Sequence, residues 1–254
     1  MSEKRSKNLK GRTFLVTRTL EGNRIESEKL EKLGAKVIEL PLIEIRPTSD
    51  REKIEEAVKK IGAFDWIVFT SANGVNAFFS KLEENKKKDI KAKFACVGSE
   101  TQKALEAQGF SPTLVPSEFL TLRLGQELLS KFGMKGKRVL LARAEEANRE
   151  ISNVLRNAEA IVVEAPVYST VIRKIKNLNR KILDHVTDIT LTSPTTVKGL
   201  VANFAPNEIK SREIRIHCIG PVTAESVRKE HLSPDSIASV HTIDGLIDSI
   251  VKEL

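Results

Sequence analysis

The amino-acid sequence predicts an α/β protein built from parallel sheets with helices on both faces. Short apolar runs rich in β-branched residues alternate with segments whose apolar residues recur at helical spacing. The same series of runs then occurs a second time in the same order, which indicates an internal duplication of one α/β half. A chain of 254 residues is long enough for two modest domains or one large one.

Composition limits the classes of protein and partner. With 40% hydrophobic and 30% charged residues, the chain has the composition of a soluble globular protein. No apolar run approaches the roughly 20 residues that span a bilayer, and the charged start lacks the apolar core of a secretory signal. Cys96 and Cys218 lie in apolar runs, as reduced core cysteines do. We therefore expect a cytoplasmic protein with no membrane partner.

The formal net charge of +8 favours an anionic partner, although a solvated lysine-rich surface also explains part of it. Aromatic residues make up only 5% of the chain and are not interleaved with basic residues, and no known nucleic-acid-binding signature occurs. We therefore expect no nucleic-acid partner.

The first copy of the pattern contains alternating strands and helices. Gly34 is expected to end the first helix as a left-handed residue. The segment 41–47 has a proline at each end and is expected to be extended. Strands are predicted over 13–17, 36–40, 66–69 and 93–97, and helices over 25–33, 50–61, 75–82, 102–108 and within 117–132.

One stretch of the first copy, from Phe64 to Phe79, indicates where a ligand could bind. Its apolar run ends in Thr70-Ser71, and a helix follows. The start of a helix leaves backbone N–H groups unpaired, so together with the hydroxyls it can bind an anion. The alternative is that Ser71 is an ordinary helix cap. The stretch 186–200 repeats the pattern with Thr192-Ser193.

Other blocks of the second copy also align with the first. Residues 136–143 match 11–18, residues 160–168 match 35–43, and residues 214–220 match 93–98, which puts the two cysteines at equivalent places. Glu159 stands where Gly34 ends the first helix, and Asn157 is near enough to supply the left-handed residue instead. Apolar residues between 175 and 183 suggest one more helix.

Candidate binding residues follow the predicted strands. In open parallel sheets ligands bind beyond the carboxyl ends of the strands. Small hydroxyl residues, glycines and two arginines lie there, and these bind anions through amides, hydroxyls and guanidinium groups. The candidates are Arg18, Thr70, Ser71, Gly98, Thr101, Arg143, Thr192, Ser193, Gly220 and Thr223.

Tyr168 is the only tyrosine and follows Pro166. It is either an amphipathic aromatic residue at a domain junction or a phenol that donates a proton in a cleft. The chain lacks a Gly-x-Gly-x-x-Gly motif, a phosphate-loop lysine, metal-ligand spacing and a nucleophilic triad. His217, alone on a strand, is expected to be a core or surface residue. We expect no cofactor and no metal.

These motifs together resemble the uroporphyrinogen-III synthase family. Each motif is short, and their order and spacing over 11–254 carry the resemblance. They are Thr17-Arg18, the Pro-Leu-Ile-Glu segment 41–44, residues 69–75, Val97-Gly98 with Thr101, residues 166–168, residues 192–194 and residues 219–224. One departure is the loop 144–149, where the family has a glycine-rich turn before an arginine. Arg149 is present here, but contacts that depend on those glycines are in question.

The resemblance implies two similar flavodoxin-like α/β domains, joined by a two-stranded β linker and exchanging their first strands. Domain one would consist of residues 1–41 and 171–254, and domain two of residues 46–165. The linker strands would be 42–45 and 166–170, and the active site would lie between the domains, where Thr70-Ser71 and Thr192-Ser193 would face each other. A simple division near Gly133 is the competing hypothesis.

The resemblance also implies the reaction. Hydroxymethylbilane, an anionic linear tetrapyrrole, loses its hydroxyl as water, and a spiro-pyrrolenine intermediate inverts ring D before closure to uroporphyrinogen III. Tyr168 would protonate the leaving hydroxyl, while Ser71, Thr101, Ser193, Thr223 and Arg215 would bind carboxylates. The resemblance implies a monomeric lyase that receives its substrate from hydroxymethylbilane synthase. The alternative function is a non-catalytic two-domain protein that binds an acidic metabolite.

Overall fold

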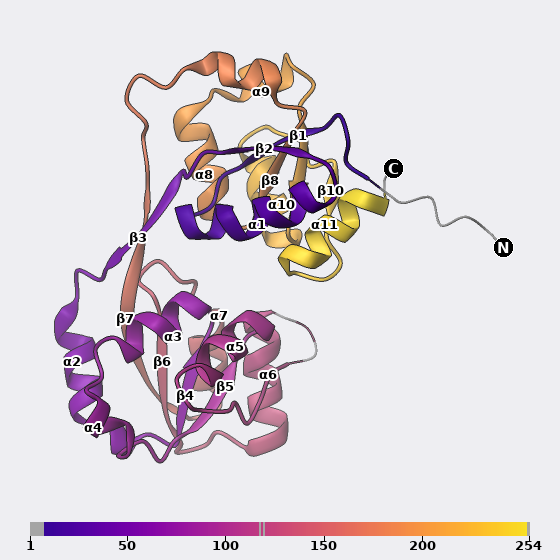
Figure 1. Ribbon diagram of the computed structural model, residues 1–254. Helices are drawn as coiled ribbons and strands as arrows, with labels where there is room; N and C mark the ends of the chain where they lie inside the picture. The colour runs from indigo at the N-terminus through magenta and orange to yellow at the C-terminus, as the bar shows by residue number, and fades with distance from the viewer. Residues whose placement is uncertain (1–7, 117, 119, 253–254) are drawn as a thin grey trace. The chain divides into compact units, whose positions relative to one another are not determined.

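The computed structural model describes residues 8–116, 118 and 120–252 (Figure 1). The chain groups into two compact units. Unit 1 combines Met1–Ile45 with Val171–Leu254, and unit 2 is the continuous range Arg46–Thr170. Figure 1 shows this in its colours, because unit 1 joins indigo elements from the beginning of the chain to orange and yellow ones from its end.

Unit 1 is built on a sheet with strand order β10-β9-β8-β1-β2, in which all the paired strands are parallel. The strands are β1 (Thr13–Val16), β2 (Lys36–Glu39), β8 (Asp188–Leu191), β9 (Arg215–Cys218) and β10 (Ser236–Ile237). The helices are α1 (Leu20–Lys32), η2 (Arg180–His185), α8 (Pro194–Asn203), α9 (Pro206–Lys210), α10 (Pro221–Lys229) and α11 (Ile243–Lys252).

The core of unit 1 has two layers because alternate residues of a strand point to opposite faces of the sheet. Phe14 and Val16 of β1 pack with Leu30 of α1 and with apolar residues of α11. Leu15 packs on the other face with α8, α9 and α10. The sheet is thus covered on both faces, as parallel sheets usually are.

Unit 2 contains the sheet β3-β7-β6-β4-β5, whose pairs β7-β6, β6-β4 and β4-β5 are parallel. The strands are β3 (Ile43–Pro47), β4 (Trp66–Phe69), β5 (Lys93–Cys96), β6 (Arg138–Ala144) and β7 (Ile161–Ile172). The helices are α2 (Arg51–Lys59), η1 (Ile61–Ala63), α3 (Ala72–Phe79), α4 (Glu84–Lys87), α5 (Ser99–Glu106), α6 (Thr121–Phe132) and α7 (Glu150–Asn157). Each of the strands β3 and β7 begins in one unit and ends in the other.

The two faces of the unit 2 sheet bury different side chains. One face packs aliphatic residues of β4 and β6 against α6 and α7, with Trp66 among them. On the other face Phe69 contacts Phe78 and Phe79 of α3 and Phe94 of β5. Most of the ten phenylalanines of the chain therefore stabilise a single unit.

The predicted parallel α/β architecture is confirmed, and so is the buried, reduced state of Cys96 and Cys218. Burial raises the pKa of each thiol to about 12. Gly34 has a φ of 87°, as predicted. In the second copy the left-handed residue is Glu159, with a φ of 60°, whereas Asn157 is the last residue of α7. The prediction for Asn157 was therefore wrong.

Two further element predictions need correction. Residues 177–183 do not form an α-helix, because Asn177 has a left-handed φ of 55° and only the short 3₁₀ helix η2 follows. The first helix, predicted over 25–33, begins at Leu20, and its apolar Ile25 is 50% exposed. No strand or helix was predicted in the last twenty residues, where the structure has β10 and α11.

Candidate functional site

Tyr168 lies on β7 in unit 2 and is only 7% exposed. Its hydroxyl is 3.0 Å from Ser71 Oγ. Ser71 is the N-cap of α3, where the same Oγ accepts a hydrogen bond of 3.0 Å from the Gly74 N–H group. Ser71 thus caps the helix, as one of its two interpretations from the sequence predicted, and the same hydroxyl also contacts the phenol.

The Tyr168 phenol is neutral at pH 7. Burial raises its pKa above the ordinary value of 10, and the hydrogen bond with Ser71 only partly offsets this. Ser71 Oγ already accepts the Gly74 N–H bond, so its own proton can be directed at the phenol oxygen. Tyr168 then keeps its O–H group available as a donor.

The loop 144–149 is fixed by side chains instead of by glycines. Glu145 accepts hydrogen bonds from the Ser49 hydroxyl, at 2.5 Å, and from the Ser49 N–H group, at 3.3 Å. Glu146 accepts one of 2.9 Å from the Thr170 N–H group. The Glu145 N–H group in turn donates to the Tyr168 carbonyl at 2.8 Å. The loop lacks the glycines of the family pattern, and the hydrogen bonds of Glu145 and Glu146 hold it in place next to Tyr168.

Arg143, a predicted binding residue at the end of β6, is 4% exposed. Its guanidinium donates to the Asn148 carbonyl and forms an ion pair with Glu164. Burial alone would raise the pKa of Glu164, but Arg143 and Arg156 outweigh it and lower that pKa. Arg143 is thus compensated by a fixed carboxylate, which leaves it little charge for a ligand.

A cavity of about 840 Å³ lies in unit 2, and Arg143 is part of its wall. Tyr168 and Ser71 do not line it. Many of its charged side chains pair with one another, namely Lys53 with Asp50, Lys60 with Glu56, and Arg143 and Arg156 with Glu164. The cavity is therefore polar but largely neutralised.

The remaining predicted residues of unit 2 lie at the same carboxyl edge of its sheet. Thr70 follows β4, and Gly98 follows β5 as the N-cap of α5. Thr101 lies in the first turn of α5 and is 4% exposed. The structure thus brings Thr70, Ser71, Gly98 and Arg143 to one edge, as the strand order requires.

In unit 1 the predicted residues also gather at the carboxyl edge. Arg18 follows β1, Thr192 and Ser193 follow β8, and Gly220 follows β9 at the start of α10, which contains Thr223. Ser193 caps α8, and its Oγ accepts from the Thr196 N–H group at 3.2 Å. The hydroxyl of Thr196 accepts the N–H groups of Thr192 and Ser193, at 3.2 and 3.1 Å.

This capping box changes what the second Thr-Ser pair can do. The N–H groups of Thr192 and Ser193 are satisfied by Thr196, and Pro194 has no N–H group. The two Thr-Ser pairs are therefore alike in capping a helix and different in the donors they leave for a ligand. Thr196 at the third helical position is the sequence signal that identifies the box.

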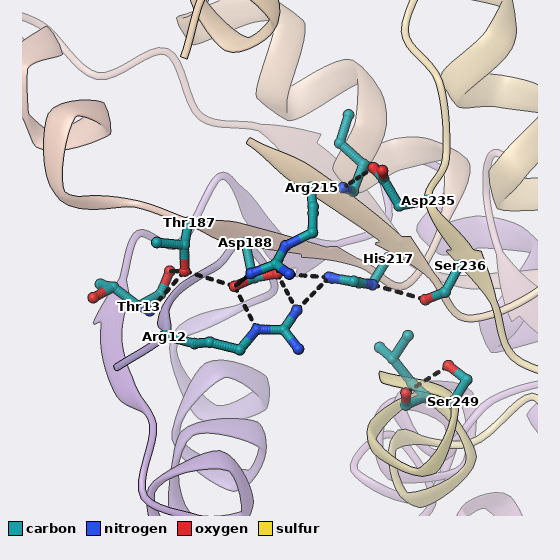
Figure 2. Close-up of polar contacts among 11 residues, drawn as sticks. Arg12, Thr13, Thr187, Asp188, Arg215, His217, Asp235, Ser236 and Ser249 are labelled. Carbon is teal, nitrogen blue, oxygen red and sulfur yellow. Dashed lines mark hydrogen bonds and ion pairs between the residues drawn. The ribbon is translucent and has the colours of Figure 1, made fainter. Parts of the chain in front are cut away.

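Arg215 does not join the other predicted residues. It is the first residue of β9, at the amino edge of the sheet, and its Nε is 3.0 Å from the Asp188 carboxylate (Figure 2). The family resemblance implied that it binds a carboxylate of the substrate. The four residues of β9 separate Arg215 from the carboxyl edge where Gly220 lies. Arg215 therefore pairs with Asp188 within unit 1 and lies apart from the other predicted residues.

Asp188, at the start of β8, is the centre of a buried polar network (Figure 2). It pairs with Arg12, whose Nε donates at 2.9 Å, and lies 2.8 Å from His217 Nε2. Burial would raise the pKa of Asp188, but the hydrogen bonds from Arg12, His217 and Thr187 hold it well below the ordinary value of 3.8. His217 is thus a core residue, one of its two predicted environments.

The network includes a Ser-His-Asp series, since His217 Nδ1 is 2.7 Å from Ser236 Oγ. Asp188 and His217 are fully buried and Ser236 is 5% exposed. The Asp188 charge is also compensated by Arg12 and Arg215. Asp188 also begins β8 at the amino edge of the sheet, away from the carboxyl edge where ligands bind, so this series is structural.

Across the described ranges there is no group of three or more His, Cys, Asp or Glu residues that could hold a metal ion. The same residues include no helix long and apolar enough to cross a membrane.

Comparison with known proteins places the chain in a family. The family model described as "Uroporphyrinogen-III synthase HemD" matches residues 26–248. The porphyrin biosynthesis protein HemD of Ruminiclostridium josui is 34% identical, over 97% of this chain and 49% of that protein. The uroporphyrinogen-III synthase of Synechococcus elongatus is 31% identical, over 94% of each chain. This chain thus spans about half the length of the first relative and nearly all of the second.

The fold agrees with these relatives. The crystal structure of uroporphyrinogen-III synthetase from Helicobacter pylori superposes with a TM-score of 0.65, at 17% identity, over 96% of this chain and all of that one. At this identity the likeness shows the fold alone. The sequence matches are extensive enough to decide the family: the chain belongs to the uroporphyrinogen-III synthase family.

Proposed function

We propose that this chain is a uroporphyrinogen-III synthase, a lyase that cyclises hydroxymethylbilane with inversion of ring D and loss of water. The observation that supports this most directly is the Tyr168–Ser71 pair, a neutral phenol and a helix-capping hydroxyl 3.0 Å apart at a strand end. Its location in a member of this family makes Tyr168 the proposed proton donor.

The chemistry asks for a weak acid and for control of conformation. Departure of the substrate hydroxyl leaves a cationic azafulvene, and protonation of that hydroxyl by Tyr168 lets it leave as water. The intermediate also closes unaided to the uninverted isomer, so the protein must hold the chain in the geometry that leads to inversion. Ser71 orients the phenol by donating a hydrogen bond to its oxygen, which leaves the Tyr168 O–H group for the substrate.

The substrate carries acetate and propionate arms, which need anion-binding groups. We assign this role to Thr70, Ser71, Gly98 and Thr101 in unit 2 and to Arg18, Thr192, Ser193, Gly220 and Thr223 in unit 1. Arg143 orders the loop 144–149 in this proposal, since Glu164 compensates its charge. The net charge of +8 attracts the anionic substrate to the protein.

The two units are proposed to be the domains of a duplicated α/β protein, with residues 42–45 and 166–170 as linker strands. Repeated sequence blocks and two five-stranded sheets support this. The protein is proposed to be a cytoplasmic monomer without a cofactor that receives its substrate from hydroxymethylbilane synthase.

The test supplies hydroxymethylbilane to the purified chain and measures the ratio of type III to type I product. Wild-type protein should give mainly type III, and Tyr168→Phe should lower the rate of type III formation about tenfold or more, the low end for acid catalysis. The matched control is Phe110→Tyr, which also changes a single ring hydroxyl but does so in the phenylalanine cluster of unit 2, where Phe110 packs on Phe79 and Phe94. This control should keep the wild-type product ratio.

Two results would contradict parts of the proposal. Full activity of Tyr168→Phe would remove the phenol from the mechanism and leave a purely conformational enzyme. Absence of type III product with wild-type protein, together with tight binding of the tetrapyrrole, would instead favour the non-catalytic binding protein.

A further inference from the structure

The buried face of α1 in unit 1 is polar between Asn23 and Ser27 and becomes apolar only at Leu30, which is unusual for a helix on a parallel sheet. Asn23 and Glu26 are fully buried and Ser27 is 4% exposed, while Leu20 and Ile25 are 66% and 50% exposed. At spacings of three and four residues the three polar side chains share one face of the helix. Covering helices normally turn apolar residues to the sheet.

Several polar atoms of this face lack a partner. Among the described residues no group hydrogen-bonds to either carboxyl oxygen of Glu26, to Asn23 Nδ2, to Ser27 Oγ or to Thr190 Oγ1 of β8. An ionised carboxylate in such a place would lose its hydration without compensation. Burial accordingly raises the pKa of Glu26, and the nearby Thr190 hydroxyl and Arg18 charge offset this only in part.

Arg18 is seated on the first turn of the same helix. Its N–H group donates to Asn23 Oδ1 at 2.6 Å, and its guanidinium approaches the Gly22 carbonyl at 3.4 Å. A Cβ atom on Gly22 would lie 3.2 Å from the Arg18 guanidinium carbon, so the glycine leaves room for that side chain. Arg18 forms no ion pair with any carboxylate in the described part of the chain.

The corresponding arginine of unit 2 differs in this respect. Arg143 pairs with Glu164, and the residue eight positions after it is Ile151, fully buried in an apolar cluster. The residue eight positions after Arg18 is Glu26. Unit 2 therefore has a compensated arginine above an apolar helix face, and unit 1 has an uncompensated arginine above a buried acid.

We propose that Glu26 is a positioning residue that stays neutral beneath Arg18, so that the Arg18 guanidinium keeps its full charge for a carboxylate arm of the substrate. This rests on the proposed function, in which Arg18 binds substrate. If Glu26 ionised, its negative charge would act on Arg18 and compete with the substrate carboxylate. A neutral Glu26 carboxyl also has an O–H group that can donate a hydrogen bond, which an ionised carboxylate lacks.

The surroundings contain few other charges that could control Glu26. Asn23 and Ser27 on α1, Thr17 after β1 and Thr190 on β8 are neutral, and the charged residues of β2, Lys36 and Glu39, are exposed. Arg18 is the charged group that acts on the Glu26 carboxyl. Ionisation of Glu26 as the pH rises would therefore change the electrostatic environment of Arg18 first.

The experiment measures KM and kcat for type III formation from neutral to alkaline pH in the wild type, Glu26→Gln and the exposed control Glu28→Gln on the same helix. In the wild type and in Glu28→Gln, KM should rise at alkaline pH while kcat changes less. Glu26→Gln cannot ionise, so this rise should be abolished and its KM at alkaline pH should be about three- to tenfold below that of the wild type.

Infrared spectroscopy supplies a readout that does not depend on activity. Wild-type protein and Glu28→Gln should show the band of a protonated carboxylic acid at neutral pH, and Glu26→Gln should lack it. A wild type without this band, or Glu26→Gln with the same alkaline rise in KM, would overturn the inference. If no type III product forms at all, the proposed function fails, and the infrared comparison still decides the state of Glu26.

Discussion

The first residues of two equivalent strands, β8 in unit 1 and β4 in unit 2, are both buried, but one is charged and the other is aromatic. In unit 1, β8 begins with Asp188, which is fully buried and paired with Arg12 and His217. In unit 2, the aligned strand β4 begins with Trp66, which is 3% exposed and lies 4.8 Å from the ring of Phe132 between centroids. Equal burial is thus reached with a charged network in one unit and with aromatic packing in the other.

The two kinds of packing respond differently to substitutions and to pH. Desolvated charges need every partner in place, and removing one leaves the others uncompensated. Aromatic packing depends on shape and buried area, and it does not change with pH. We therefore expect unit 1 to be sensitive to single polar substitutions and to acid, and unit 2 to volume changes.

The largest expected effect comes from Asp188→Asn. It leaves the Arg12 guanidinium buried without its counter-charge, which should lower the free energy of unfolding by about 3–5 kcal/mol. Hydrogen exchange measured by mass spectrometry should show the loss in unit 1. Trp66 is the only tryptophan and lies in unit 2, so the fluorescence transition should move much less.

Replacing the whole network tests whether the loss comes from the orphaned charge. Arg12→Met, Asp188→Leu and His217→Leu together should be neutral or stabilising by about 1–4 kcal/mol. A triple variant as unstable as Asp188→Asn would contradict this explanation and indicate that the network itself is needed for the fold.

Acid should affect the two units differently. The pKa of Asp188 is lowered in the folded state, so its contribution to stability is complete above the ordinary value of 3.8 and is lost as the pH falls further. The loss is about 1.4 kcal/mol for each pH unit between the unfolded and folded pKa values. Exchange protection should disappear from unit 1 before unit 2 below about pH 4. Simultaneous loss in both units would argue against Asp188 as the cause.

A smaller effect is expected where the two first helices of the repeat end. Gly34 has a φ of 87° and Glu159 a φ of 60°. Glu159→Gly should stabilise the chain by about 1 kcal/mol because glycine adopts this conformation without strain, and Gly34→Ala should destabilise it by a similar amount. Urea unfolding measures both. If Glu159→Gly is destabilising, the exposed ion pair of Glu159 with Lys135 contributes more than such pairs usually do.

Much of the fold could be predicted because hydrophobic periodicity and strand–helix alternation are local signals. The strands at 66–69 and 93–97 and the glycine at 34 follow from residue type and spacing alone. The 3₁₀ helix η2 could not be predicted in this way, because Leu183 is buried in either kind of helix. The helix α1 also breaks the rule that apolar residues mark the buried side, since Ile25 is exposed and Glu26 is buried.

The sequence could predict which candidate residues lie at the ends of strands, but not which side chains they pair with. The rule about carboxyl edges placed Ser71, Arg18 and Gly220 correctly at such edges. It could not distinguish Arg18 from Arg143, because the compensating Glu164 comes from another strand. The pairing of Arg215 with Asp188 could not be predicted either, because it depends on how β8 and β9 lie side by side. Contacts between strands distant in sequence decide which arginine is free.

The two-part composition of unit 1 has a consequence for synthesis. The strand β1 needs β8 as a neighbour, and β8 lies more than 170 residues further along the chain. At 5–20 residues per second the ribosome takes roughly 4–17 s to make the segment 171–254 after unit 2 is complete. Unit 2 can therefore fold first. During this time the edge of β1 that later pairs with β8 remains unpaired. Nascent chains stalled after residue 170 should depend most on chaperones.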